Sequence, residues 1–263
     1  MVNILEQYLI ENWQAINGRG SLPGDLSLLK LGGQNSARGS LNFLVFTEDK
    51  KDPGYFLKMN RKPGHFLPID KEFHNLNKLA GALGPRMTDT FPRPIFMGKV
   101  DDFTLILVES FLKCAKININ KYCELSILSL LSFHWLRDFF VLTRKGETNF
   151  GVSELERSLG LLMPGSGISG DCIKKAEEIL EIGRRYHGAY VPLCSAQGDF
   201  DFSNILINKN GIAVVDWEDY RELSHPFLDP EFFIFNAAAY FYPGQDHTAG
   251  FRRFFLQAPG QRH

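Results

Sequence analysis

The segment that decides the fold reads Ala196-Gln-Gly-Asp-Phe-Asp-Phe-Ser-Asn-Ile-Leu-Ile207, and Ala213-Val-Val-Asp-Trp-Glu218 follows it closely. Two short, largely apolar runs, 204–207 and 212–215, flank Asn208-Lys-Asn-Gly211. An Asn-Gly pair between two such runs is a strong hairpin signal, because both residues accept the positive φ angles of a tight turn. The sequence therefore predicts a β-hairpin that follows an aspartate-containing loop.

Three oxygen-bearing side chains flank this predicted hairpin. Asp199 comes five residues before Asn204, on the loop that enters the first strand, and Asp216 follows the second strand. We expect these side chains to converge on one point. Oxygen ligands of this kind suit Mg²⁺, which takes phosphate oxygens in its remaining coordination positions. The phosphoryl-transfer template asks for this set: an Asp base, an Asn that holds metal, and a second metal-binding Asp. Two alternatives stay open, a capped turn beside a solvent-facing Asp and a metal-hydrolase pair of Asp199 with Asp201.

The same template predicts a lysine on an early strand and a glutamate on the next helix. Lys58 lies within Tyr55-Phe-Leu-Lys-Met59, where its apolar neighbours make an unpaired charge costly. Glu72 follows fourteen residues later and opens the next predicted helix. We therefore expect an ion pair, with a surface lysine on a strand as the alternative.

Two glycine-rich segments need separate interpretations. Leu31-Gly-Gly-Gln-Asn-Ser-Ala-Arg-Gly-Ser40 separates the first two predicted strands, and its backbone amides could face phosphate oxygens. It is not a Walker A loop, because no Gly-Lys-Ser/Thr follows, and an ordinary hairpin turn is an equal alternative. Gly165-Ser-Gly-Ile-Ser-Gly170 has dinucleotide-binding spacing, but no strand precedes it and no acidic residue follows at the right distance. We interpret it as a loop between helices.

The periodicity of the apolar residues divides the chain. A helix is predicted over residues 1–17, and another, over 69–83, interrupts a series of strands; these strands are predicted over 26–31, 41–46, 55–59, 94–98 and 103–108. Beyond Phe111 helices are predicted over 121–141 and 171–186, interrupted only by the hairpin. This order predicts an α+β protein with two lobes, 1–112 and 113–263, and a cleft between them.

Composition excludes several classes of protein. The 263 residues include 29 Lys and Arg against 30 Asp and Glu, so no overall positive charge attracts nucleic acid or anionic lipid. The longest stretch without a charged residue runs from Phe232 to Gln245, short of the roughly 20 residues of a spanning helix. The amino terminus lacks the pattern of a secretory signal, so we expect a cytoplasmic protein. Four cysteines without a Cys-x-x-Cys pair and scattered histidines predict free core thiols and no zinc site.

These residues resemble a known signature. Gln197-Gly-Asp-Phe-Asp-Phe-Ser-Asn204 with Val215-Asp-Trp-Glu218 is similar to the His-Gly-Asp-x-x-x-x-Asn and Ile-Asp-Trp/Phe-Glu motifs of the aminoglycoside phosphotransferase and choline kinase-like family. The resemblance covers roughly residues 25–235 and extends to Lys58, Glu72 and the Val108–Phe111 crossover. It implies a bilobal protein-kinase-like fold with a β-rich N-lobe and a helical C-lobe that carries the catalytic hairpin. It also implies transfer of phosphate from ATP, with Mg²⁺, to a hydroxyl of a small molecule such as a sugar, an amino alcohol or an aminoglycoside.

Carried over residue by residue, the resemblance makes Asp199 the catalytic base. It makes Asn204 and Asp216 the Mg²⁺ ligands, and it makes Lys58, held by Glu72, the contact to the α- and β-phosphates. The loop with Gly32, Gly33 and Ser36 would cover the phosphates, and backbone groups near Glu109 and Phe111 would bind adenine.

Two departures from the signature bear on activity. Gln197 replaces the usual His, and because an amide still donates and accepts hydrogen bonds, we expect reduced rigidity of the loop with its chemistry kept. Only 47 residues follow Asp216, so substrate-recognition helices could be shortened and the carboxyl terminus truncated. These departures motivate the alternative of a pseudokinase-like module that binds nucleotide without turnover.

The acidic residues after Asp216 have more than one interpretation; they are Glu218, Asp219, Glu222, Asp229 and Glu231. They could favour a cationic acceptor, or they could form a solvated acidic rim. Pairing of Asp229 with a backbone turn is a further, structural interpretation.

Overall fold

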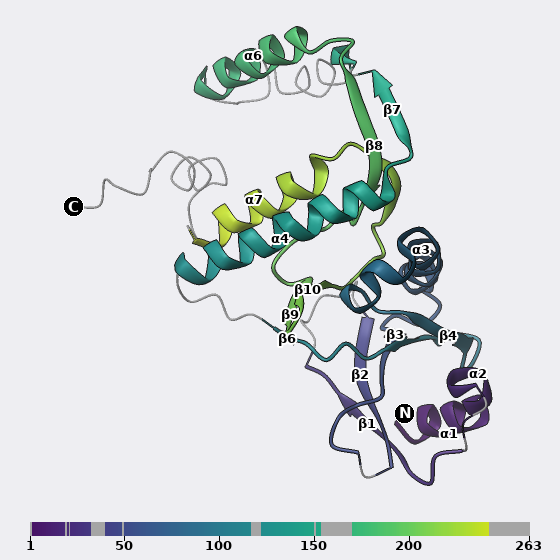
Figure 1. Cartoon of the computed structure of the whole chain (residues 1–263). Helices are drawn as coiled ribbons and strands as arrows, with labels where there is room; N and C mark the ends of the chain where they lie inside the picture. Colours follow the sequence, from purple (N-terminus) through teal and green to yellow (C-terminus); the bar gives the residue numbers. More distant parts are fainter. Residues whose placement is uncertain are drawn as a thin grey trace.

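The computed structural model describes residues 2–18, 20, 22–32, 40–48, 50–116, 122–149, 151–153 and 170–241 (Figure 1). The amino-terminal region contains a five-stranded antiparallel sheet in the order β1-β2-β3-β5-β4. Its strands are β1 (Leu26–Lys30), β2 (Ser40–Thr47), β3 (Tyr55–Asn60), β4 (Pro94–Lys99) and β5 (Leu105–Ser110). All five strands predicted for this region are confirmed.

One face of this sheet is covered by the amino-terminal helices. The helix predicted over 1–17 is in fact two, α1 (Val2–Glu11) and α2 (Trp13–Asn17). The break falls at Asn12, whose side-chain amide donates to the carbonyl of Tyr8 at 2.9 Å. Side chains that bond to nearby backbone in this way compete with the regular helix pattern. Apolar residues of both helices, among them Leu5, Leu9 and Trp13, pack against the sheet in one core.

Helix α3 (Leu67–Leu83) packs on the opposite face of the sheet and also on the carboxyl-terminal region. Near its start, Ile69 contacts the buried side chains of Leu105 and Leu107 on β5. Further along, Leu76, Leu79 and Leu83 enter the largest core, which consists mostly of residues after 120. A 3₁₀ helix, η1 (Gly84–Thr90), follows. Because α3 is packed on both regions, a side chain on it has a fixed position relative to both.

The carboxyl-terminal region contains α4 (Tyr122–Thr143), α6 (Gly170–Arg185) and α7 (Leu228–Phe241). It also contains the predicted hairpin, as β9 (Ile205–Asn208) and β10 (Gly211–Val214). The helices predicted over 121–141 and 171–186 are confirmed; α7 was not predicted. In Figure 1 the hairpin lies between the five-stranded sheet and the helices α4 and α7.

The prediction that this hairpin alone interrupts the helices is wrong. Strand β6 (Ala115–Lys116) joins it in a three-stranded sheet, and a second sheet has the order β11-β8-β7. Its strands are β7 (Gly146–Asn149), β8 (Tyr190–Ala196) and β11 (Arg221–Ser224). They escaped prediction because β7 is fully exposed and polar, and because Pro192 stands inside β8, where proline argues against a strand.

Helix α4 is a core helix with an apolar outer side. Within it, the stretch Leu125–Thr143 is long and apolar enough, by length and composition only, to cross a membrane. It carries the exposed ion pair of Arg137 with Asp138, and Leu128, Leu136 and other residues of its inner side are buried in the largest core. About a third of this stretch is buried inside the protein.

Candidate functional site

Lys58 and Glu72 form a buried ion pair, as the sequence predicted. The Lys58 Nζ lies 2.6 Å from both carboxylate oxygens of Glu72, and both residues are almost fully buried, on β3 and α3. Burial alone would lower the pKa of Lys58, but the carboxylates of Asp216, Glu72 and Glu109 outweigh it and hold this pKa well above its usual range. The ammonium group therefore stays charged. It is a fixed cation that three carboxylates surround.

Asp216 is brought to this pair by the backbone of the next residue. The Trp217 N–H donates to Glu72 Oε1 at 3.0 Å, and Lys58 Nζ lies 3.3 Å from Asp216 Oδ1. The amide of Asn75 on α3 donates to the carbonyls of Trp217 and Glu218 at 2.8 and 3.2 Å. Asp216 has a φ of +63°, which few non-glycine residues adopt without surrounding support. Helix α3 thus holds the segment after the hairpin in a strained conformation, with the Asp216 carboxylate half exposed.

Gln197 connects the loop before the hairpin with the segment after it. Its side chain is fully buried; Oε1 accepts the Asp199 N–H at 2.8 Å, and Nε2 donates to the carbonyls of Asp216 at 2.5 Å and Val215 at 3.3 Å. An amide can do both at once because it carries a donor and an acceptor at fixed positions. Gln197 therefore ties the backbone of Asp199 to that of Asp216.

The start of the same loop is held from α7. Both oxygens of the fully buried Asp229 accept backbone N–H groups, from Gln197 at 2.8 Å and from Gly198 at 2.9 Å. Burial raises the pKa of Asp229 to about 6, and these two N–H groups oppose that rise. The interpretation of Asp229 as the partner of a backbone turn is confirmed, and it therefore does not line an acidic rim.

Asp199 and Asn204 lie side by side at the entrance to the hairpin. The Asn204 Nδ2 donates to the Asp199 carbonyl at 2.9 Å and to Asp199 Oδ2 at 3.1 Å. Burial, followed by the charge of Asp201, raises the pKa of Asp199 to about 6, while the hydrogen bond from Asn204 opposes the rise. Asp201 itself accepts three hydrogen bonds within the turn, from Ser203 N, Ser203 Oγ and Asn204 N. Its engagement there makes a metal-hydrolase pair with Asp199 a poor interpretation.

The arrangement suits a hard divalent cation. Asn204 uses its amide nitrogen on Asp199, which leaves Oδ1 as the free end of the side chain apart from a 3.3 Å contact from Ser203 Oγ. Asp216 offers a half-exposed carboxylate. Amide and carboxylate oxygens are the ligands that Mg²⁺ takes, with phosphate or water completing the shell. Among the described residues, no group of three or more His, Cys, Asp or Glu side chains could hold a metal ion by themselves.

Some of the remaining predicted residues lie within the part of the chain that the structure describes, and others lie outside it. Gly33 and Ser36 lie outside the residues that the structure describes, as does the glycine motif at 165–169. Gly32 is described, and a Cβ added to it would have no atom within 4 Å. Glu109 and Phe111 lie at the end of β5 and just beyond it. The sequence pointed to backbone groups here, yet it is the side chain of Glu109 that is buried beside Lys58. Which face of the sheet this side chain takes depends on the register of β5 against β3.

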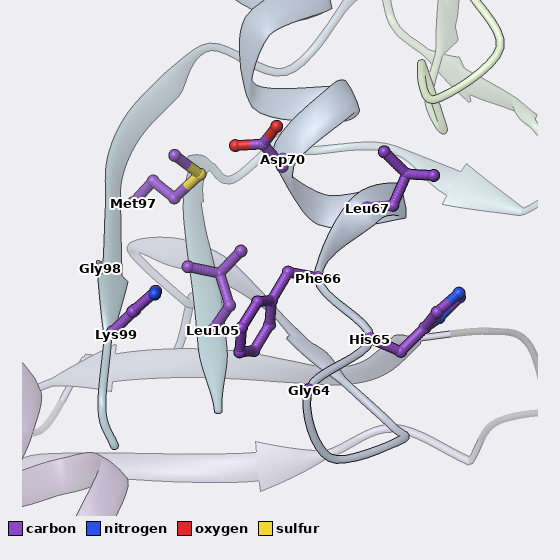
Figure 2. A pocket seen from close by; sticks show the side chains of 9 residues that line it. All are labelled: Gly64, His65, Phe66, Leu67, Asp70, Met97, Gly98, Lys99 and Leu105. Atoms are coloured by element: carbon purple, nitrogen blue, oxygen red, sulfur yellow. The ribbon is translucent and has the colours of Figure 1, made fainter. Parts of the chain in front are cut away.

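A cavity with a volume of about 630 Å³ lies away from this site (Figure 2). Its lining comes from the segment before α3, from the start of that helix and from β4 and β5, and it includes Phe66, Asp70, Met97 and Lys99. Figure 2 shows Lys99 beside the Phe66 ring, with the ammonium 5.2 Å from the ring centre. None of the residues that converge on Asp216 lines this cavity.

The fold, with this site in place, is that of the protein-kinase-like phosphotransferases. No protein-family model and no curated protein sequence matches the chain. Solved structures do match the chain. One is a thermostable mutant of aminoglycoside phosphotransferase APH(4)-Ia in a ternary complex with ADP and hygromycin B. Its TM-score is 0.55 at 14% sequence identity, and the match covers 95% of this chain and 81% of that chain.

Two further solved structures match the chain equally broadly. A choline/ethanolamine kinase family protein from Mesorhizobium loti gives a TM-score of 0.53 at 12% identity, over 97% and 76% of the two chains. Aminoglycoside phosphotransferase APH(3'')-Id from Streptomyces rimosus gives 0.52 at 12% identity, over 96% and 91%. At these identities the matches establish the fold, so the fold class predicted from the sequence is confirmed.

Proposed function

We propose that this protein is an ATP- and Mg²⁺-dependent O-phosphotransferase that phosphorylates a hydroxyl group of a small molecule. The observation that carries the proposal is the junction at Asp216, where the buried Lys58–Glu72 pair meets the hairpin loop. A buried cation, two oxygen ligands and a carboxylate of raised pKa are the parts that phosphoryl transfer uses. We also propose that residues 1–112 and 113–263 are the two lobes of this catalytic unit, in the cytoplasm.

The protein's part in binding the nucleotide would be to supply fixed charge and fixed ligands. Lys58 would contact the α- and β-phosphates, because Glu72 holds it in place while its charge persists. Asn204 and Asp216 would hold Mg²⁺, which when bound neutralises charge on the β- and γ-phosphates. Gly32, Gly33 and Ser36 would cover the phosphates, and the backbone near Glu109 and Phe111 would take the adenine.

Asp199 would act on the acceptor. As the acceptor oxygen forms its bond to the γ-phosphorus, the bond between that phosphorus and the bridging oxygen of ADP breaks, and the hydroxyl proton passes to the Asp199 carboxylate. The raised pKa of Asp199 favours this role, because a base works best when its pKa approaches the working pH. Gln197 and Asn204 orient the base through its backbone N–H and its carboxylate.

The acceptor is a small molecule that carries a hydroxyl group. Solved structures with this fold include proteins whose names specify aminoglycosides, choline or ethanolamine, which are cationic or have cationic parts. Of the acidic residues after Asp216, Glu222 pairs with Lys78 and Lys145, and Asp229 is buried under the loop. Among the described residues, no ion pair engages Glu218, Asp219 or Glu231, so these three remain to favour a cationic acceptor.

The experiment has two stages. First, a thermal-shift titration with Mg-ATP should stabilise the wild-type protein, and Asp216→Ala should remove the shift. Second, ATP consumption is measured over a panel of sugars, amino alcohols and aminoglycosides, with turnover expected on at least one. Nucleotide binding without turnover on any acceptor would instead support a regulatory nucleotide-binding module. The Gln that stands in the usual His position motivates that alternative.

A further inference from the structure

A second cavity, of about 380 Å³, lies on the face of the five-stranded sheet that α1 covers. Its walls come from α1, β2 and β3 and from the turns that follow β3 and β4. A volume of this size suits a small molecule, since ligand sites in proteins measure about 300–1,000 Å³. Most of the lining side chains are apolar; they include Ile4, Leu5, Leu41, Met59, Val100 and Phe103.

Among the described residues that line this cavity, Arg61 alone is cationic. It follows β3 directly, two residues after Met59, and so emerges beside the apolar core under α1. Its Nε is buried and has no hydrogen-bond partner. Its Nη2 lies 3.5 Å from the carbonyl oxygen of Ser40, at the outer limit of a hydrogen bond. Within the described part of the chain, no carboxylate forms an ion pair with this guanidinium.

The surroundings of Arg61 leave its chemistry incomplete. The guanidinium is always charged in proteins and carries five N–H donors. A buried donor without an acceptor destabilises the folded state, and a charge beside apolar groups adds to this penalty unless a counter-charge is present. The described fold supplies neither an acceptor for Nε nor a counter-charge. An anionic ligand would supply both.

The other polar side chains of the cavity are already engaged. Asn60 donates to two backbone carbonyls, at 2.7 and 2.8 Å, and its Oδ1 accepts a backbone N–H at 2.6 Å. Asp101, the one carboxylate in the described lining, accepts the Phe103 N–H at 2.8 Å and the Thr104 hydroxyl at 3.1 Å. Because Asp101 is exposed, solvent and salt screen its charge. Arg61 is therefore the polar group left for a ligand.

The cation and the apolar walls together define the ligand. The N–H fork of a guanidinium matches the two oxygens of a carboxylate. Apolar walls favour an aliphatic or aromatic body over a strongly hydrated ion such as inorganic phosphate. One positive charge is balanced by one negative charge.

We propose that this cavity binds a monocarboxylate with an apolar body, whose carboxylate pairs with Arg61. The site is separate from the proposed phosphoryl-transfer site. Adjacent residues of a strand project to opposite faces, so Lys58 lies on the other side of the sheet from Met59, which lines the cavity. Failure of this proposal would leave the proposed function standing.

The test measures binding of octanoate, 1-octanol and acetate to the full chain by titration calorimetry. Octanoate should bind at least about tenfold more tightly than 1-octanol, because only octanoate offers a charged acceptor to the guanidinium. It should also bind at least about tenfold more tightly than acetate, which lacks the apolar body. Equal affinity of octanoate and either of the other two ligands would overturn the proposal, as would no measurable binding of octanoate at millimolar concentration.

Arg61→Met keeps an apolar stem and removes the guanidinium. It should weaken octanoate binding at least about tenfold and change 1-octanol binding by less than about threefold. Lys62→Met is the matched control, because it removes an exposed positive charge from the same turn and should leave octanoate binding unchanged. Unchanged octanoate binding in Arg61→Met, or an equal loss in both variants, would overturn the proposal. If Arg61→Met fails to fold, the ratio of octanoate to 1-octanol affinity in wild-type protein decides alone.

Discussion

The two halves of the candidate site are built in opposite ways. The amino-terminal half places Lys58 and Glu72 on a strand and a helix, inside the protein, and joins them by a direct ion pair. The carboxyl-terminal half places Asp199 and Asp216 on loops, partly exposed, and ties their backbones together through Gln197. Each carboxylate has one further contact, from Asn204 and from Lys58.

The difference separates two physical tasks. A charge that must persist is best held by a buried partner on a rigid element, where solvent cannot screen the pair. The side chains that must bind metal, phosphate and acceptor, Asp199 and Asp216, need free oxygens. The loops that carry them are therefore held mainly by hydrogen bonds to the main chain. Substitutions in the first half should therefore act mainly on stability, and substitutions in the second mainly on turnover.

The largest loss of stability is expected in the amino-terminal half. Glu72→Ala leaves Lys58 buried with its closest partner gone and removes the acceptor of the Trp217 N–H. Breaking a buried pair in this way costs about 3–5 kcal/mol. Urea unfolding measures the loss, with Glu72→Gln as the matched control, because its single amide oxygen can still accept from the Trp217 N–H while the charge and the second acceptor for Lys58 are lost. Equal stability of Glu72→Ala and wild-type protein would contradict the claim that the buried ion pair of the amino-terminal half stabilises the fold.

A smaller loss is expected where the loop passes close to the segment after Trp217. Gly198 has a φ of +92°, and an added Cβ would lie 2.2 Å from the Asp219 carbonyl oxygen. Gly198→Ala should cost about 2–4 kcal/mol from strain and overpacking together. The control is Gly188→Ala, where φ is +80° but no atom lies within 4 Å of the added Cβ, so about 1 kcal/mol is expected. Similar losses at the two positions would show that the close approach is unimportant.

The contrast between the two halves also explains which parts of the site could be predicted from the sequence. The Lys58–Glu72 pair was predictable because a lysine within an apolar strand demands a partner and the next helix supplies one. The hairpin was predictable from its turn residues. Both signals are local, and both predictions are confirmed.

The parts that escaped prediction depend on contacts between distant segments. Pairing of Asp229 with a backbone turn was one of the interpretations, but its partners, the N–H groups of Gln197 and Gly198, lie more than thirty residues away and were not specified. The pairing of β8 with β7 and β11 is invisible in strands that are short, polar or interrupted by Pro192. The burial of the Glu109 carboxyl could be read only once the register of β5 was known.

Gln197 should show an intermediate effect that appears in both readouts. Gln197→Ala removes the partners of the Asp199 N–H and the Asp216 carbonyl, which should cost about 1–3 kcal/mol and lower kcat more than it raises KM. Gln197→His restores the residue usual in the signature and should retain most of the activity. Urea unfolding and steady-state kinetics on the same proteins give both values. An unchanged kcat in Gln197→Ala would contradict the role of this amide in holding the two segments together.

The smallest effect is expected from an ion pair outside the site. Lys113 Nζ lies 2.7 Å from Asp52 Oδ2, but both side chains are mostly exposed. Exposed pairs of this kind contribute less than about 1 kcal/mol. Asp52→Ala should therefore change the urea midpoint little, and the change should vanish in high salt. A loss of stability as large as that of Glu72→Ala would mean that burial does not determine how much these ion pairs contribute to the free energy of unfolding.

Asp199 offers the most direct test of phosphoryl transfer by this site. Asp199→Asn preserves size and most hydrogen bonds and removes only the base, so Mg-ATP should bind as it does to wild-type protein. Turnover on the acceptor found by the panel should fall about 10²- to 10⁴-fold. Normal turnover by Asp199→Asn would contradict the assignment of the base, and with it the account of the site.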